Sequence, residues 1–86
     1  MNKSYKIKIY TSNNCVFCNS AKQLLRKKKL KFKEINISKD NKLKKEMIKK
    51  SNGMMTVPQI FINNKHIGGF KELIDLTNSR KINEII

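Results

Sequence analysis

The sequence predicts an α/β fold in which a small four-stranded mixed sheet carries helices on both faces. Segments with a two-residue alternation of apolar side chains indicate strands, and longer segments with three- and four-residue spacing indicate amphipathic helices. These segments follow one another in the order βαβαββα. The opening βαβ unit implies two parallel strands with a right-handed crossover, and the later strands add antiparallel pairs.

The first half of the chain contains two expected strands with a helix between them. Apolar residues alternate with lysines over residues 5–10, as in a strand with one buried face. Over residues 15–29 the apolar residues recur at helical spacing, which indicates an amphipathic helix with Asn14 as its N-cap. Residues 32–37 form the second expected strand, and their charged flanks are typical of the edge of a sheet.

A second helix is expected to run to about residue 50. Ser38 and Asp40 both offer caps for its start, and Gly53 is the expected residue at its end. Leu43 and Met47 belong to a thin apolar stripe along it. The helix is therefore expected to bury only one narrow side.

A hairpin and a third helix follow. Residues 57–62 and 65–68 read as strands, and the Asn-Asn pair at 63–64 reads as a tight turn because asparagine tolerates positive φ. The third helix is expected over residues 70–77, and Ser79 is a candidate cap for a last short turn. Three isoleucines near the end of the chain are expected to pack back on the core: Ile82, Ile85 and Ile86.

Composition limits the class of protein. The 86 residues suffice for one domain, expected over residues 1–86, and we expect a monomer. A net charge of +14 can indicate a polyanionic partner, but nearly all the basic residues are lysines spread among many asparagines and isoleucines. These three residue types have A- and T-rich codons, so we attribute the charge to base composition and expect no specific nucleic-acid binding. Without a recognisable signal peptide or membrane span, we expect a cytoplasmic protein with no membrane association.

Both cysteines, Cys15 and Cys18, lie at the predicted start of the first helix. With His66 as the only histidine they cannot complete the four ligands of a structural zinc site, so no metal is expected. A permanent disulfide would close a very small loop and stabilise little. Redox chemistry fits better, because a helix N-terminus favours a thiolate at Cys15, and Cys18 lies one turn later on the inward face, where it can resolve a mixed disulfide.

Three further motifs indicate a family. TVPQIFI at residues 56–62 and HIGGF at 66–70, together with CVFC at 15–18 and the IYT that comes before it, resemble a glutaredoxin of the small dithiol type. The resemblance implies a thioredoxin-like fold, a cis bond before Pro58, and a glutathione-dependent oxidoreductase. Such an enzyme reduces protein disulfides and glutathionylated proteins, with glutathione as reducing co-substrate and no permanently bound cofactor.

The resemblance also implies a glutathione-binding groove beside the catalytic pair Cys15 and Cys18. The backbone of Val57 would pair with the cysteine moiety of glutathione. The helix after Gly69 would hold the γ-glutamyl carboxylate, and Gln59 would reach the other carboxylate. The residues expected to bind glutathione are Phe17, Thr56, Val57, Pro58, Gln59, Gly69, Phe70 and Lys71.

The chain departs from the usual family pattern at three places. Val-Phe at 16–17 replaces Pro-Tyr between the cysteines, and Ser12 replaces a common lysine. Phe-Lys at 70–71 replaces Cys or Ser followed by Asp, an acidic contact that Glu72 would have to supply. Two other functions stay open: a redoxin that thioredoxin reductase reduces and that serves ribonucleotide reductase, and a carrier of a [2Fe–2S] cluster held between two chains.

Other noticeable residues have ordinary interpretations. His66 is expected to be a plain residue of the short fourth strand, and the basic run at residues 26–29 is expected to be a solvated helix end. Met54 and Met55 have two interpretations of equal weight: they form a docking surface for target proteins, or they fill the loop before Pro58.

Overall fold

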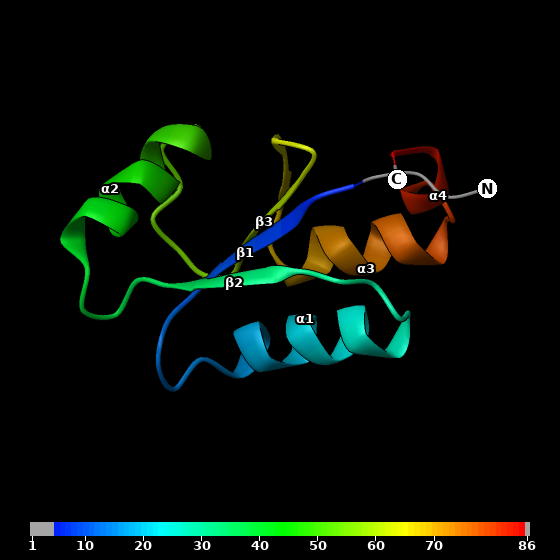
Figure 1. Ribbon diagram of the computed structural model, residues 1–86, viewed down its shortest axis with the longest axis horizontal. Coiled ribbons are helices and arrows are strands. Elements are labelled where there is room, and N and C mark those ends of the chain that lie inside the picture. The colour runs from blue at the N-terminus through cyan, green and yellow to red at the C-terminus, as the bar shows by residue number, and fades with distance from the viewer. Residues whose placement is uncertain (1–4, 86) are drawn as a thin grey trace.

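A four-stranded sheet forms the centre of the computed structural model, which describes residues 5–85 (Figure 1). Its strands, in the spatial order β2-β1-β3-β4, are β1 (Ile7–Thr11), β2 (Lys33–Asn36), β3 (Gln59–Ile62) and β4 (Lys65–Gly68). β1 and β2 are parallel, whereas β3 is antiparallel to both β1 and β4. The predicted mixed sheet is therefore confirmed, and β2 lies at an edge, as its charged flanks indicate.

The helices cover both faces of this sheet, as predicted. α1 (Val16–Lys27) and α3 (Phe70–Asn78) contact each other on one face, and α2 (Asn41–Lys50) lies on the other (Figure 1). The short helix α4 (Ile82–Ile85) follows α3. Since α1 connects the parallel strands β1 and β2, the first three elements form the expected βαβ unit.

Alternation along the strands divides the apolar side chains between two cores. The core under α1 and α3 contains Ile7, Ile9, Ala21, Leu25, Ile60, Ile62, Leu73 and Ile82. The core under α2 contains Tyr10, Ile37, Met47 and Phe61. Each face of the sheet is thus covered by a core of its own, and the ends of β1 and β3 lie between the two cores.

A buried hydroxyl ties α2 to the sheet. The hydroxyl of Tyr10 donates to Glu46 Oε1 at 2.7 Å, and Lys50 pairs with the same oxygen at 3.2 Å. Burial, reinforced by Glu46, raises the pKa of Tyr10 well above its ordinary value, and the hydrogen bond from Tyr10 lowers the pKa of Glu46. This contact holds α2 beside the end of β1.

Residues with positive φ form the hairpin and end α2. Asn63 and Asn64 have φ values of 52° and 69°, which confirms the predicted tight turn. α2 ends slightly differently from the prediction, because Asn52 is the first left-handed residue (φ 60°) and Gly53 (φ 90°) follows it. The N–H of Gly53 then donates to the carbonyl of Ile48 at 2.8 Å and closes the helix end.

Of three predicted helix caps, Asp40 has the expected role, whereas Ser38 and Ser79 have other roles. Asp40 caps α2 by accepting a first-turn N–H at 3.0 Å, whereas the Ser38 hydroxyl accepts the N–H of Asn13 at 2.6 Å. Ser79 is the C-cap of α3 and does not begin the last turn, and its hydroxyl donates to the carbonyl of Leu76 at 3.3 Å. A serine hydroxyl bonds whichever backbone group lies nearest, and the sequence does not reveal which that is.

Two of the three C-terminal isoleucines pack back on the core, as predicted. Ile82 is buried and Ile85 packs against the core under α1 and α3, whereas Ile86 lies outside the described residues. Among residues 5–85, no helix combines the length and the apolar character needed to cross a bilayer.

Candidate active site

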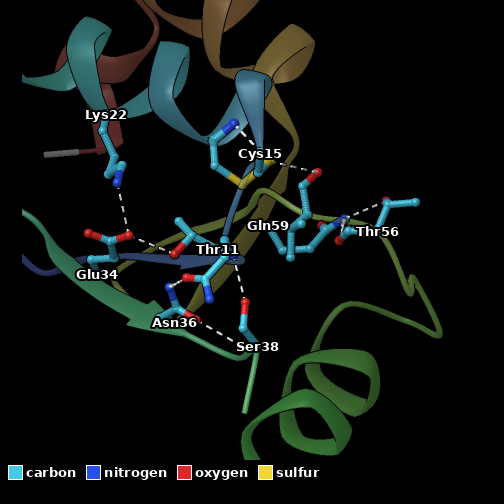
Figure 2. Close-up of a disulfide and its surroundings, with 11 residues drawn as sticks. Thr11, Cys15, Lys22, Glu34, Asn36, Ser38, Thr56 and Gln59 are labelled. Atoms are coloured by element: carbon cyan, nitrogen blue, oxygen red, sulfur yellow. Dashed lines mark hydrogen bonds and ion pairs between the residues drawn. A yellow bond between two sulfur atoms is a disulfide. The ribbon is translucent and has the colours of Figure 1, made fainter. Parts of the chain in front are cut away.

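A short loop carries the chain from the end of β1 to the start of α1. The N–H of Asn13 donates to the Ser38 hydroxyl, and the Asn36 side chain donates to the side-chain oxygen of Asn13 at 3.0 Å (Figure 2). Asn14 adopts a left-handed conformation (φ 56°) that turns the chain into the helix. The loop is therefore held by the last residue of β2 and by a serine two residues later, and sequence reasoning missed these contacts.

Cys15 is the N-cap of α1, a role predicted for Asn14. Its backbone is extended (φ −111°, ψ 106°), its carbonyl accepts the N–H of Asn19 at 3.1 Å, and its Sγ accepts the N–H of Cys18 at 3.1 Å. The prediction is wrong because the left-handed turn at Asn14 excludes the extended conformation that a cap residue needs. Sγ of Cys15 thus faces unpaired N–H groups, which stabilise negative charge on sulfur once the pair is reduced.

Cys15 and Cys18 form a disulfide whose two sulfurs differ in exposure (Figure 2). Cys18 is 1% exposed, whereas Cys15 is only partly buried. An attacking thiol must be reached by the substrate, so the geometry agrees with Cys15 as the outer sulfur and Cys18 as the inner one. In the described part of the chain, no group of three His, Cys, Asp or Glu side chains could hold a metal ion.

The segment before β3 faces this disulfide. The peptide bond between Val57 and Pro58 is cis, as the resemblance implies, and the carbonyl oxygen of Val57 lies 4.0 Å from Cys15 Sγ. Pairing of β3 with β1 begins at Gln59, so Val57 lies beyond the paired part of the sheet. Its backbone is positioned at the sulfur without belonging to the strand ladder.

A groove of about 490 Å³ runs from this segment to α3, and we call it the α3 groove. All eight residues predicted to bind glutathione line it: Phe17, Thr56, Val57, Pro58, Gln59, Gly69, Phe70 and Lys71. Met54, Glu72 and Ile74 complete the lining. The rings of Phe17 and Phe70 lie 6.1 Å apart between centroids, so two aromatic side chains from different helices form part of its wall.

At its α3 end the groove contains a carboxylate of the protein itself. Glu72 Oε1 accepts the N–H of Gly69 at 2.7 Å. Gly68 (φ 128°) lies so close that a β-carbon on it would be 2.8 Å from Glu72 Cγ. The N–H groups of Phe70 and Lys71 belong to the first turn, which a helix leaves unpaired. An incoming ligand therefore meets N–H donors, the Lys71 ammonium and the Glu72 carboxylate together.

Gln59 lies beneath the groove with its amide already bonded. Its Nε2 donates to the carbonyl oxygen of Thr56 at 3.0 Å and to Thr56 Oγ1 at 3.3 Å, and its Oε1 lies 2.7 Å from His66 Nε2 (Figure 2 shows the Thr56 contacts). Because the Thr56 carbonyl only accepts, the amide orientation is determined, and His66 Nε2 must carry the proton. The structure places this amide under the groove, 1% exposed, and contact between Gln59 and a glutathione carboxylate stays a prediction.

His66 therefore does more than occupy an edge strand. Its ring also packs on Phe61, with centroids 5.0 Å apart, and it bonds Gln59 of β3, whose amide in turn bonds Thr56 in the segment before Pro58. This connection could not be predicted, because an alternating strand pattern does not reveal which polar side chains meet across the sheet.

A second polar connection lies beneath the active-site loop. The hydroxyl of Thr11 donates to Glu34 Oε2 at 2.7 Å, and Lys22 pairs with the same oxygen at 2.9 Å (Figure 2). These contacts hold the pKa of Glu34 below its ordinary value, the Thr11 hydrogen bond being the main cause and Lys22 the next. They join β1, β2 and α1 at the end of the sheet from which Cys15 projects.

Large apolar side chains near the disulfide are exposed. Val16 is 73% and Met55 68% exposed, and Phe17 and Met54 are also exposed. Both methionines are thus largely accessible in the loop before Pro58, and a docking role for them stays a prediction. Exposed apolar surface of this kind is available to a partner.

Comparisons with known proteins agree on one family. The family model described as Glutaredoxin matches residues 7–67. Glutaredoxin 1 of Rickettsia prowazekii (strain Madrid E) is 44% identical over 89 residues, which cover 100% of this chain and 94% of the relative. Glutaredoxin 3 of Escherichia coli (strain K12) is 46% identical over 70 residues, which cover 81% of this chain and 83% of the relative.

A solved structure gives the same result for the fold. The solution structure of a glutaredoxin from Brucella melitensis has a TM-score of 0.79 and 38% identity, covering 92% of this chain and 85% of the other. The thioredoxin-like fold that the resemblance implies is thereby confirmed.

Proposed function

The chain belongs to the glutaredoxin family and is a thiol–disulfide oxidoreductase with a Cys15–Cys18 redox pair, and we propose that glutathione is its reductant. The proposed substrates are protein disulfides and mixed disulfides between proteins and glutathione. The reaction requires one chain and suits the cytoplasm, where thiols are kept reduced.

In the dithiol route, the Cys15 thiolate attacks one sulfur of a substrate disulfide. A bond forms between Cys15 and that sulfur, the substrate bond breaks, and the other sulfur leaves as a thiolate that takes up a proton. Cys18 then attacks Cys15 Sγ, which closes the internal disulfide and releases the second substrate thiol. One glutathione thiolate reopens the pair by bonding to Cys15, and another removes that glutathione as glutathione disulfide.

A glutathionylated protein needs only Cys15. The thiolate takes the glutathionyl sulfur, the protein cysteine leaves as the thiolate, and a second glutathione regenerates Cys15. Cys18 has no necessary part in this route. The proposal therefore assigns the two cysteines separable roles.

The observation that supports glutathione best is the α3 groove. Its volume of about 490 Å³ suits a small ligand, and it begins at Val57, whose carbonyl lies 4.0 Å from Cys15 Sγ. An extended tripeptide pairing with the Val57 backbone would bring its own sulfur to Cys15. Its γ-glutamyl carboxylate would then reach the first turn of α3 and Lys71, and its ammonium group would reach Glu72.

Single-cysteine variants test the proposal directly. We expect Cys15→Ser to abolish reduction of both a protein disulfide and a glutathionylated peptide, with glutathione and glutathione reductase as the coupled reductant. We expect Cys18→Ser to lose the first activity and keep the second, because only the dithiol route uses Cys18. Equal loss of both activities in Cys18→Ser contradicts the assigned roles.

The choice of reductant separates the remaining alternatives. The same assay is run on the wild-type chain with glutathione or with thioredoxin reductase and NADPH. Turnover with glutathione supports the proposal, whereas turnover with thioredoxin reductase alone assigns the chain to the redoxin class. A cluster carrier would show visible absorbance after anaerobic reconstitution with iron and sulfide, together with poor turnover in both assays.

A further inference from the structure

A second groove begins at Val57 and lies on the α2 side of the sheet. It has a volume of about 220 Å³, and we call it the α2 groove. Its lining consists of Ser12, Ile37, Ser38, Asn41, Lys44, Met55 and Val57. Val57 lines both grooves, and α2 and α3 cover opposite faces of the sheet (Figure 1), so the two grooves diverge from the residue that contacts Cys15 Sγ.

One wall of the α2 groove is held by hydrogen bonds. The N–H of Ile37 donates to the carbonyl of Thr11 at 2.9 Å, and the N–H of Ser38 donates to the side-chain oxygen of Asn36 at 2.9 Å. The Ser38 hydroxyl accepts from Asn13, which leaves its own hydrogen free to donate (Figure 2). The wall and the active-site loop therefore form one structure.

The α2 side of the site is strongly cationic. Six lysines lie on or just before this helix: Lys39, Lys42, Lys44, Lys45, Lys49 and Lys50. The two acidic residues of the same segment are already engaged, since Asp40 caps the helix and Glu46 bonds Tyr10 and Lys50. Positive charge is thus left over, and Lys44 brings it to the groove.

The groove also has an apolar side. Val57 and the buried Ile37 contribute to its lining, and Met55 stands beside them with 68% of its surface exposed. A volume of about 220 Å³ is below the range of about 300–1,000 Å³ that is usual for small-molecule sites. Its size and shape suit one or two side chains of a polypeptide better than a second tripeptide.

We propose that the α2 groove receives the polypeptide beside the reactive cysteine of a substrate protein, and that it favours an acidic residue there. The carboxylate would pair with Lys44 and the Ser38 hydroxyl, and a neighbouring apolar side chain would contact Met55. Glutathione, released or incoming, uses the α3 groove on the other side of Val57. This inference rests on the proposed function and adds the class of protein substrate.

Short glutathionylated peptides test the selectivity. Two peptides share one sequence, with an apolar residue near the cysteine, and differ only in carrying Asp or Asn beside that cysteine. The measured quantity is the ratio of kcat/KM for the Asp peptide to kcat/KM for the Asn peptide. Since exposed ion pairs are weak, we expect a ratio of about twofold to fivefold for the wild-type chain, falling as salt is raised.

Charge-matched variants identify the residue responsible. Lys44→Glu should bring the ratio to one or below, whereas Lys49→Glu, on the same helix but outside the groove lining, should leave it at the wild-type value. Both variants change the net charge equally, so Lys49→Glu controls for the loss of net charge. A wild-type ratio of one, or an equal fall in both variants, overturns the proposal.

A trapped complex gives an independent measurement. In Cys18→Ser, an activated Asp peptide without glutathione can be left disulfide-bonded to Cys15, and amide NMR shifts can be compared with the peptide-free chain. Shifts at Ser12, Asn41 and Lys44 support the proposal, and shifts confined to the α3 groove overturn it. Shifts at the α2 groove with free glutathione alone also overturn it, because the site would then take a small molecule.

Failure of the selectivity is distinct from failure of the proposed function. A small mixed disulfide of glutathione and mercaptoethanol contains no polypeptide, so its turnover by the wild-type chain reports on Cys15 and the α3 groove alone. Turnover of this compound with no Asp preference overturns the α2 proposal and leaves the proposed function intact. Absence of turnover overturns the proposed function itself.

Discussion

Replacing Gly68 with alanine tests how the α3 groove is built at its α3 end. Gly68 has a φ of 128°, which L-residues rarely adopt, and a β-carbon there would lie 2.8 Å from Glu72 Cγ and 2.9 Å from Glu72 Oε1. The substitution combines backbone strain of about 1–3 kcal/mol with loss of the Glu72 contact to Gly69, a cap worth about 0.5–2 kcal/mol. We expect the free energy of unfolding to fall by about 2–4 kcal/mol.

Two further substitutions separate the components. Gly53 has a φ of 90° with nothing within 4 Å of its would-be β-carbon, so Gly53→Ala reports backbone strain alone. Glu72→Ala removes the cap alone and should cost about 1 kcal/mol. In the double variant Gly68→Ala/Glu72→Ala, two of the three atoms nearest to the new β-carbon are removed, and the Glu72 β-carbon remains at 3.0 Å. The double variant should therefore lose about 1 kcal/mol less than the sum of the single variants.

Urea denaturation of the oxidised chain at neutral pH, followed by circular dichroism, measures all four variants, and equal m-values would show that the unfolded states are comparable. Two results would refute the reasoning. One is a loss in Gly68→Ala no larger than that in Gly53→Ala. The other is additivity of Gly68→Ala and Glu72→Ala within about 0.3–0.5 kcal/mol, since independent sites add to that accuracy.

Two other contacts give predictions of a different kind. The pKa of Glu34 is lower in the folded chain than in the unfolded chain. The Glu34 carboxylate therefore stabilises the fold at pH values above its pKa in the unfolded chain, and this stabilisation is lost as the pH falls through its pKa in the folded chain. In urea denaturation at neutral pH, Glu34→Gln should thus have a lower free energy of unfolding than the wild-type chain. This difference in free energy should disappear below about pH 4, and a difference that does not depend on pH contradicts the prediction. The His66 ring should show the Nε2–H tautomer in ¹⁵N NMR, because Gln59 Oε1 accepts from it. His66→Ala should destabilise by about 1–3 kcal/mol and raise KM for glutathione more than it lowers kcat, and unchanged KM would show that the contact does not reach the groove.

Most of the architecture was predictable because local patterns determine it. Strand alternation at residues 5–10 and helical spacing after Cys15 each follow from which side chains face a core, and the Asn-Asn turn follows from its tolerance of positive φ. Seven of the eight predicted groove residues were recognisable because they lie in three short motifs, and Lys71 directly follows the third motif. Residues that are adjacent in sequence are also adjacent in space, so such motifs can be recognised without knowledge of the fold.

Contacts between distant segments were not predictable in the same way. The role of Cys15 as the N-cap of α1 depends on the turn at Asn14, and the neighbouring Asn13 is held by Asn36 at the end of β2 and by Ser38. The hydrogen bond from Thr11 to Glu34 joins positions that become neighbours only when β1 pairs with β2. A single Thr or Glu in a sequence does not indicate its hydrogen-bond partner, because each side chain can bond many kinds of donor or acceptor.

The position of Val57 connects these contacts to substrate choice. A disulfide substrate has two halves that meet at the sulfur under attack, so an enzyme with one outer sulfur needs room for both halves beside it. Here Cys15 and Val57 lie just beyond the ends of β1 and β3, and because helices cover both faces of the sheet, the two proposals place one half toward α3 and the other toward α2. The α3 side supplies helix N–H groups and aromatic walls, whereas the α2 side supplies surplus lysine charge. Among residues 5–85 only Val57 lines both grooves, so we expect substitutions on α2 to change the proposed preference for protein substrates and to leave the lining of the α3 groove as it is.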